Sequence, residues 1–176
     1  MKLKKLNLMN LNEVNFMEKL YLDSFPKEEQ RPTERMFKAY ENSQNKFSIL
    51  LAVTESKNVG FFNFWDFDKF IFAEHFAISS DFRSGGYGSR VMKVFMENIS
   101  KPIVLEVEPP ETEISQRRIG FYERLGFKLW DKIKYRQPSY ESKGISYPMR
   151  IMSVGELDIE KDHKSVIETI HNVYSI

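Results

Sequence analysis

Three β-strand patterns follow one another with very short connections in the first half of this 176-residue chain. Residues 47–55 (FSILLAVTE), 59–68 (VGFFNFWDFD) and 69–78 (KFIFAEHFAI) are rich in β-branched and aromatic residues, which favour strands. The links between them, at 56–58 and 66–69, are too short for the crossover that parallel strands require. The patterns therefore predict an antiparallel meander, which restricts the fold to one with a largely antiparallel sheet.

After a glycine-rich loop, the succession of strand patterns gives way to alternating helix and strand patterns. A helix pattern at 89–99, a short buried strand at 103–108 and a helix at 114–126 follow it. A strand–helix–strand unit places its two strands parallel, with a right-handed crossover. The other expected elements are a strand Lys2–Leu8, a helix Glu13–Ser24 capped by Asn12, a helix from Pro32 to Tyr40, strands at 127–136 and 147–155, and an amphipathic helix within 156–174. The prediction is an α/β (α+β) fold, with a mixed, mostly antiparallel sheet of about seven strands, helices on both faces and one parallel β-α-β unit.

Composition narrows the chemistry. The chain has no cysteine, which excludes disulfides, thiolate nucleophiles and cysteine zinc sites. Its three histidines, His75, His163 and His171, are far apart in sequence, so we expect no metal site. The net charge of +1 is unlike that of a nucleic-acid-binding protein, which is usually strongly basic. From this charge we expect no nucleic-acid partner. Asparagines interrupt the apolar residues of the first 16 positions, which is unlike a signal peptide or a membrane span, so we expect a cytoplasmic protein with no membrane partner.

Three glycines lie within four positions, Gly85, Gly86 and Gly88, between a predicted strand and a predicted helix. A helix N-terminus binds anions through its unpaired N–H groups and its dipole, and glycine lets the backbone approach a phosphate closely. Arg83 is placed to add a charge-assisted contact. A Walker A loop is excluded because no Gly-Lys-Ser/Thr sequence is present, and the dinucleotide fingerprint lacks its third small residue at Val91. The residues alone leave two interpretations, a pyrophosphate loop and a turn that merely starts a helix.

Two motifs together resemble the GNAT superfamily of N-acetyltransferases. The tripeptide at 76–78, followed by Arg83-x-x-Gly86-x-Gly88 and a helix, is similar to the family's acyl-CoA signature, Gln/Arg-x-x-Gly-x-Gly/Ala. The segment FYERLGF at 121–127 resembles the FYxxxGF segment that follows the fifth strand in that family. The resemblance covers about residues 2–154 and extends to tracts similar to those of uncharacterised bacterial members. Ser115 and Arg118 depart from it, because many members have asparagine and a small residue there.

The resemblance implies acetyl-CoA as co-substrate and no metal. Backbone groups of Phe76, Ala77 and Ile78 would bind the pantetheine arm, in a splay between the fourth and fifth strands. The pyrophosphate would be held by the loop of Arg83, Ser84, Gly85, Gly86, Tyr87, Gly88 and Ser89. Residues 1–155 would form the acyl-CoA-dependent N-acetyltransferase domain, with 156–176 as a helical extension packed on it.

Tyr122 is the candidate catalytic acid. The reaction needs a proton for the departing thiolate, and a phenol, with an ordinary pKa of about 10, keeps its proton at neutral pH. The alternative is a core tyrosine, because Ile119, Tyr122 and Leu125 form an apolar stripe of a helix. The match to the family's tyrosine favours the catalytic interpretation.

Glu74 is the candidate base, because it is a carboxylate within the apolar strand FIFAEHFAI and burial raises the pKa of a carboxyl group. His75 points to the opposite face of the strand, so at most one of the two faces the acceptor. Glu106, in IVLEVE, is a further candidate. Glu111 and Glu113 fit either a negative acceptor entrance or a solvated turn.

The sequence thus predicts an N-acetyltransferase that moves an acetyl group directly to a primary amine, because a chain without cysteine cannot form a cysteine-bound acyl intermediate. The alternative is a non-catalytic acyl-CoA-binding or sensing module. The resemblance implies that the acceptor, a small molecule or a peptide amine, binds near the segments 25–35 and 136–147. The C-terminal helix could also mediate a homodimer.

Overall fold

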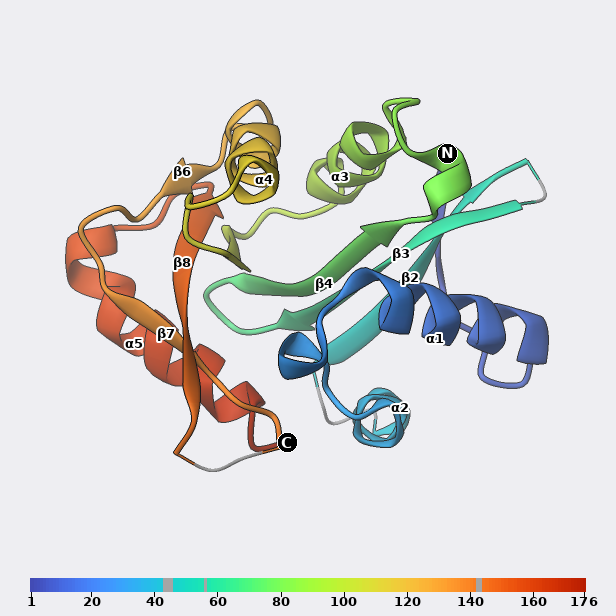
Figure 1. Cartoon of the computed structure of the whole chain (residues 1–176), viewed down its shortest axis with the longest axis horizontal. Helices are drawn as coiled ribbons and strands as arrows, with labels where there is room; N and C mark the ends of the chain where they lie inside the picture. The colour runs from blue at the N-terminus through green and yellow to red at the C-terminus, as the bar shows by residue number, and fades with distance from the viewer. Residues whose placement is uncertain (43–45, 56, 142–143) are drawn as a thin grey trace. The chain divides into compact units, whose positions relative to one another are not determined.

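A computed structural model describes residues 1–42, 46–55, 57–141 and 144–176. The chain forms two compact units, the first made of residues 1–66 and 73–100, the second of residues 67–72 and 101–176. Figure 1 shows the elements of both, and each unit is described by itself. The strands are β1 (Lys2–Lys5), β2 (Phe47–Thr54), β3 (Lys57–Asp66), β4 (Ile71–Ile78), β5 (Ile103–Val107), β6 (Lys128–Leu129), β7 (Tyr135–Pro138) and β8 (Ser146–Val154).

The strands form one mixed sheet in the order β1-β2-β3-β4-β5-β8-β6, with β7 paired to β8. Neighbouring strands run antiparallel except β4 and β5, which are parallel, as the strand–helix–strand pattern predicts. The backbone N–H of Ile71, at the start of β4, donates to the carbonyl of Pro102 at 2.8 Å. The predicted fold class is therefore confirmed, including the antiparallel β2–β3 hairpin. Its connection includes residue 56, which lies outside the described residues.

The described residues form eight strands, where the sequence predicts about seven. The predicted strand at 127–136 is two short strands, β6 and β7, because the chain turns between them and the Ile133 N–H donates to the Trp130 carbonyl. The Trp130 indole is buried and donates to the Ser153 hydroxyl of β8 at 2.9 Å. A buried tryptophan needs such a partner, and its anchoring accompanies the break in the strand pattern.

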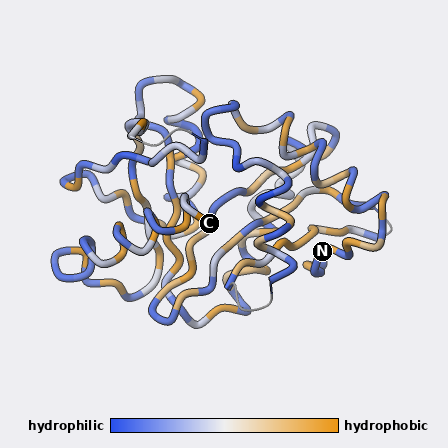
Figure 2. The backbone as a smooth tube through the Cα atoms, turned by 90° about the horizontal axis from the view of Figure 1, so that it is seen from below, coloured by the Kyte–Doolittle hydropathy of each residue, from blue (hydrophilic) through white to orange (hydrophobic). Residues whose placement is uncertain are grey.

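In the first unit, helices cover both faces of the strands, as predicted. Figure 1 shows α3 (Tyr87–Glu97) on one side of β2–β4, and α1 (Leu11–Ser24) with α2 (Thr33–Glu41) on the other. Successive residues of β3 point to opposite faces. The ring of Phe61 lies 6.0 Å from that of Tyr21 in α1, and the ring of Phe62 lies 4.3 Å from that of Phe95 in α3. The alternation of apolar and polar stretches along the chain is visible in Figure 2.

Helix α1 begins two residues earlier than predicted. Its N-cap is Asn10, not Asn12, and the Asn10 side chain accepts hydrogen bonds from the backbone N–H groups of Asn12 and Glu13. The Glu13 carboxylate in turn accepts from the Lys4 ammonium at 2.8 Å, which lowers the pKa of Glu13. Both asparagines suit a cap chemically, so the choice depends on these contacts.

The second unit is built from β5 to β8, α4 (Glu113–Glu123) and α5 (Ile159–Val173). Helix α5 buries Val166, Ile170 and Val173 at helical spacing, in agreement with the predicted amphipathic helix, and contacts β7. Tyr174, which follows the helix, stacks on Tyr140 with ring centroids 4.5 Å apart. No helix within the described ranges is long and apolar enough to span a bilayer.

Candidate functional site

The glycine loop joins the short helix η2 (Ser80–Phe82) to α3, within the first unit. Ser84 and Gly86 both have positive φ, of 68° and 70°. This left-handed backbone conformation is common for glycine and rare for other residue types such as Ser84, and it turns the chain sharply into the helix. The helix begins at Tyr87, so Gly86 is its N-cap, and no side chain among the described residues caps it.

The N-terminus of α3 is therefore an uncapped set of donors. The backbone N–H groups of Gly86, Tyr87, Gly88 and Ser89 are the four that a helix leaves without a carbonyl partner, and the first helical bond runs from Arg90 to the Gly86 carbonyl at 3.1 Å. A Cβ atom built on Gly86 meets no described atom within 4 Å, so the space beside these donors is open. The dipole of an 11-residue helix adds partial positive charge at the same point.

Two exposed arginines border this loop. The Arg83 Nε donates to the carbonyl of Ile78 at 3.0 Å, which ties the loop to the end of β4. Arg90 donates to the carbonyl of Gly85 at 3.0 Å, and its guanidinium lies 4.1 Å from the centre of the Tyr87 ring. The sequence indicated Arg83 but missed Arg90, although its position one helical turn after the N-cap was a usable signal.

The strand segment 76–78 adjoins the same loop. The side chains of Phe76 and Ile78 pack with Tyr87 against the buried cluster of Ala52, Val59 and Val91. The structure thus brings the predicted pantetheine and pyrophosphate residues together in one unit. The carbonyl of Ile78 already accepts from Arg83, a partner that the sequence did not reveal.

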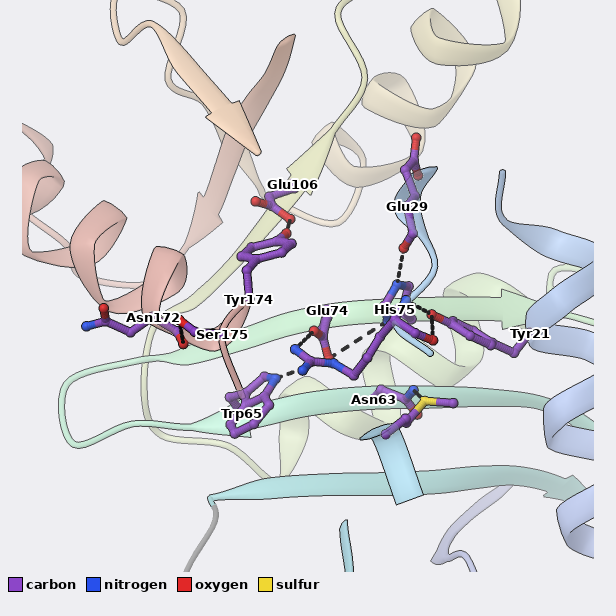
Figure 3. A network of polar contacts seen from close by, with 12 residues as sticks. Tyr21, Glu29, Asn63, Trp65, Glu74, His75, Glu106, Asn172, Tyr174 and Ser175 are labelled. Atoms are coloured by element: carbon purple, nitrogen blue, oxygen red, sulfur yellow. Dashed lines mark hydrogen bonds and ion pairs between the residues drawn. The ribbon is translucent and has the colours of Figure 1, made fainter. Parts of the chain in front are cut away.

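Glu74 lies on β4 and is buried, as expected, but it lies beside a cation. Its Oε1 accepts from the Arg31 guanidinium at 2.6 Å. Its Oε2 accepts from the Trp65 indole at 3.1 Å, and Figure 3 shows the side chains of Glu74 and Trp65. The two charged side chains are 0% and 1% exposed. The interpretation as a base rested on burial alone, whereas Arg31 stabilises the ionised carboxylate. The role of Glu74 as a base stays a prediction.

The His75 side chain contacts the segment between α1 and α2. Its Nε2 lies 3.0 Å from the carbonyl of Glu29, and its ring packs edge-on against Tyr21 and Phe25. Burial lowers the pKa of His75, so the ring is neutral at pH 7 even though Nδ1 lies 3.9 Å from Glu74. The Tyr21 hydroxyl donates to the carbonyl of Arg31 and accepts from the backbone N–H of the same residue. These contacts fix the 25–32 segment to β4.

Tyr122 lies in the last turn of α4, in the second unit. Its ring packs against Phe121 and Phe127, with centroids 5.0 and 5.4 Å away. Desolvation of the phenol raises the pKa of Tyr122 to about 12, against the opposing effect of Arg118. The side chain is partly exposed, and its hydroxyl bonds to no side chain or backbone group in the described part of the chain. The Tyr122 hydroxyl is therefore a protonated donor that makes no hydrogen bond to the described residues.

The two departures from the family pattern have structural roles. Ser115 is buried at the start of α4 and forms a capping box with Thr112, in which each side chain accepts from the other's backbone N–H. Arg118 donates to the Glu108 carboxylate at 2.5 Å. Glu111 and Glu113 are exposed, in agreement with a solvated turn. Among the described residues, no group of three or more His, Asp or Glu side chains gathers as metal ligands.

Glu106 has partners that the sequence did not reveal. The hydroxyl groups of Tyr135 and Tyr174 donate to its two carboxylate oxygens (Figure 3 shows Tyr174). Tyr174 follows α5 and lies beyond residues 2–154, the range over which the sequence itself indicated a resemblance to the family. No local pattern links it to β5, because 68 positions separate the two residues.

Comparison with known proteins gives a consistent result. The sequence model of the Acetyltransferase (GNAT) family matches residues 14–127. A Bacillus subtilis (strain 168) protein named as an acetyltransferase, YjbC, is 29% identical over 172 residues, which cover 90% of this chain and 82% of YjbC. A solved structure described as a GNAT-family acetyltransferase, from Bacteroides thetaiotaomicron, is 37% identical with a TM-score of 0.92, covering 100% of this chain and 99% of that one. An aminoglycoside 6'-N-acetyltransferase complexed with coenzyme A shares the fold at 15% identity, with a TM-score of 0.61 and coverage of 90% of this chain and 100% of that one.

Proposed function

Because this chain belongs to the GNAT family of acetyltransferases, we propose that it moves the acetyl group of acetyl-CoA directly to a primary amine. The amine nitrogen attacks the thioester carbonyl, a C–N bond forms, the C–S bond breaks and CoA leaves as a thiol. The observation that carries the proposal is the uncapped N-terminus of α3, where backbone donors and the helix dipole adjoin open space and two arginines border the loop. A pyrophosphate is the anion that suits this arrangement.

The residues of this loop would hold acetyl-CoA as co-substrate. We assign the pyrophosphate to the N–H groups of residues 84–89 with Arg83, and add Arg90 to the predicted set. The backbone of 76–78 would bind the pantetheine arm. The catalytic domain would be residues 1–155, with 156–176 as its helical extension. A coenzyme A complex of a protein with the same fold is consistent with this assignment.

Two proton transfers complete the reaction. Tyr122 is the proposed acid for the thiolate, because its phenol is protonated at neutral pH and is not used by the fold. Glu74 is the proposed base for the acceptor ammonium, because it is a carboxylate within an apolar strand and Arg31 stabilises its ionised form. The acceptor is a small molecule or a peptide that carries a primary amine.

Replacing Gly86 by valine is expected to weaken CoA binding by at least about tenfold, a loss of about 1.4 kcal/mol. A Cβ atom at this position meets no described atom within 4 Å, so the added side chain would enter the open space where the pyrophosphate would lie. The measurement is calorimetric titration of the full chain with CoA.

The matched control is Gly144→Val. Gly144 also has a positive φ, of 82°, and open space around its Cβ, so this variant carries a similar backbone penalty in a different loop. We expect it to lose stability like Gly86→Val and to bind CoA like the unmodified chain. Equal CoA affinity of both variants and the unmodified chain would show that the glycine loop does not bind CoA.

A further inference from the structure

A cavity of the second unit lies between the connection from β6 to β7 and the first turn of α5, two segments that Figure 1 shows. It is lined by residues 130–133 on one side and by residues 157–160 with His163 on the other. Its volume is about 660 Å³, within the range of about 300–1,000 Å³ that is usual for small-molecule sites. These residues belong neither to the glycine loop nor to the segments that the resemblance gives to the acceptor. The proposed function therefore leaves this cavity without a role.

Both walls of the cavity are fixed by contacts within the chain. The Trp130 N–H donates to the Ile151 carbonyl at 2.8 Å, and the Ile133 N–H donates to the Trp130 carbonyl at 3.1 Å, which closes the turn. On the other side, the Asp158 side chain accepts from the backbone N–H of Lys161, and its carboxylate pairs with the Lys161 ammonium at 2.9 Å. A ligand would therefore not have to order either wall, which favours its binding.

Apolar side chains line both walls. Trp130 is buried, whereas Ile133, Leu157 and Ile159 each keep part of their surface exposed. Apolar surface that is still accessible to water in a concave site gives favourable free energy when a ligand covers it. The cavity thus suits a ligand whose larger part is apolar.

The charged residues that line the cavity favour a cation. Asp131 and Glu160 are exposed, and neither carboxylate forms an ion pair or a hydrogen bond with the described residues. These two unpaired carboxylates outnumber the single ammonium of Lys132 in the lining. The positive end of the α5 dipole would favour an anion, but the Asp158 cap and the acidic first turn, with Glu160 and Asp162, offset it. A positively charged ligand is therefore the one that these charges attract.

His163 adds a hydrogen-bond acceptor. Its Nδ1 lies 2.8 Å from the Ile159 carbonyl and 3.1 Å from the Glu160 carbonyl. Because a carbonyl only accepts, Nδ1 carries the hydrogen, and Nε2 of the neutral ring is then an acceptor. This Nε2 forms no hydrogen bond within the part of the chain that the structure describes. It is available to an N–H group of a ligand.

We propose that this cavity, called the 130–163 cavity below, binds a small molecule with an apolar body and a protonated amine group. The apolar body would cover the accessible part of the isoleucine and leucine side chains. The amine would lie near the two unpaired carboxylates and donate to Nε2 of His163. The proposal goes beyond acetyl transfer, because it gives the chain a second small-molecule site that is independent of which amine is acetylated.

The test is an NMR titration of the full chain, with ¹⁵N-labelled tryptophan, against 2-phenylethylammonium chloride at constant ionic strength. The chain has two tryptophans and thus two indole N–H signals. The Trp130 signal is identified by its change in Ser153→Ala, which removes the acceptor of that indole. It is expected to shift until saturation, whereas the signal of Trp65, which lies in the first unit, is expected to stay in place.

Two probes and three variants test the chemistry of the site. 2-Phenylethanol, which is uncharged, and 3-phenylpropionate, an anion, are expected to bind at least about fivefold more weakly than 2-phenylethylammonium. The double variant Asp131→Asn/Glu160→Gln is expected to weaken 2-phenylethylammonium binding by about fivefold, because two charge contacts are lost. His163→Phe keeps a ring without the acceptor and is expected to weaken binding by about threefold. The matched control, Glu97→Gln/Glu168→Gln, removes two exposed acids outside the cavity lining and is expected to bind like the unmodified chain.

The proposal is overturned by an unmoved Trp130 signal, by a shift confined to Trp65, or by equal affinity for either of the other two probes. It is also overturned if Asp131→Asn/Glu160→Gln binds 2-phenylethylammonium like the unmodified chain, or if the matched control loses as much affinity. Should the double variant fail to fold, the comparison of the three probes on the unmodified chain decides. The titration contains no CoA, so its result does not depend on the proposed acetyl transfer.

Discussion

Tyr122→Phe is expected to lower kcat for acetyl transfer by at least about 100-fold, the usual scale for loss of a general acid. The ring would keep its packing against Phe121 and Phe127, so only the proton donor is removed. Both KM values should change little, because the hydroxyl makes no hydrogen bond that supports the described structure. Steady-state kinetics with acetyl-CoA and a primary amine provide the measurement.

The pH dependence gives this prediction a second readout. An acid must be protonated to act, so activity that depends on it falls as pH rises through its pKa. Since the pKa of Tyr122 is raised to about 12, we expect no fall in kcat from this group between about pH 7 and 10. The control is Tyr40→Phe, which removes a hydroxyl that donates to the Leu6 carbonyl and should leave kcat unchanged. A Tyr122→Phe enzyme that retains more than about one tenth of kcat contradicts the assignment.

Glu74→Ala is expected to lower the free energy of unfolding by about 3–5 kcal/mol, the scale for breaking a buried ion pair. Its carboxylate and the Arg31 guanidinium are almost completely buried and 2.6 Å apart. Removing Glu74 leaves the Arg31 charge buried without this carboxylate and removes the acceptor of the Trp65 indole. Urea denaturation followed by circular dichroism measures the change.

Two further variants distinguish the effect of burying the ion pair on stability from the effect of its charges. Glu108→Ala breaks the partly exposed pair of Glu108 and Arg118, in which the two side chains are 35% and 39% exposed, and should lower the free energy of unfolding by about 1 kcal/mol or less. The double variant Arg31→Met/Glu74→Leu removes both buried charges and is expected to be more stable than Glu74→Ala alone. A loss in Glu74→Ala no larger than that in Glu108→Ala would mean that the buried pair does not hold the 25–32 segment to β4.

The sequence predicted those features that depend on local pattern. The strands at 47–55 and 69–78 follow from runs of β-forming residues, and the helix after Gly86 follows from a glycine-rich turn before an apolar stripe. Where two local structures are equally compatible with the sequence pattern, tertiary contacts determine which of them forms. Asn10 rather than Asn12 caps α1, and the anchored indole of Trp130 accompanies the division of one predicted strand into β6 and β7.

In the candidate site too, the sequence predicted the residues that form one contiguous segment but not the contacts between distant segments. The glycine loop is contiguous, so its residues could be named and the structure gathers them around the start of α3. The surroundings of Glu74 and Glu106 come from residues 43 and 68 positions away, Arg31 and Tyr174. Such pairings depend on how distant segments pack, which no periodicity in a single sequence records. Buried charge could thus be predicted at Glu74, but not the cation beside it.

Transfer of acetyl to a primary amine is tested most directly by measuring thiol release and product mass together. The full chain is incubated with acetyl-CoA and a panel of primary amines, small molecules and peptides. Because the chain contains no cysteine, every protein-dependent thiol that appears is CoA. We expect one thiol for each amine that gains an acetyl group, and an equal decrease of both signals in Gly86→Val at a subsaturating concentration of acetyl-CoA. Tight CoA binding without thiol release on any amine would contradict the account and identify a non-catalytic acyl-CoA-binding module.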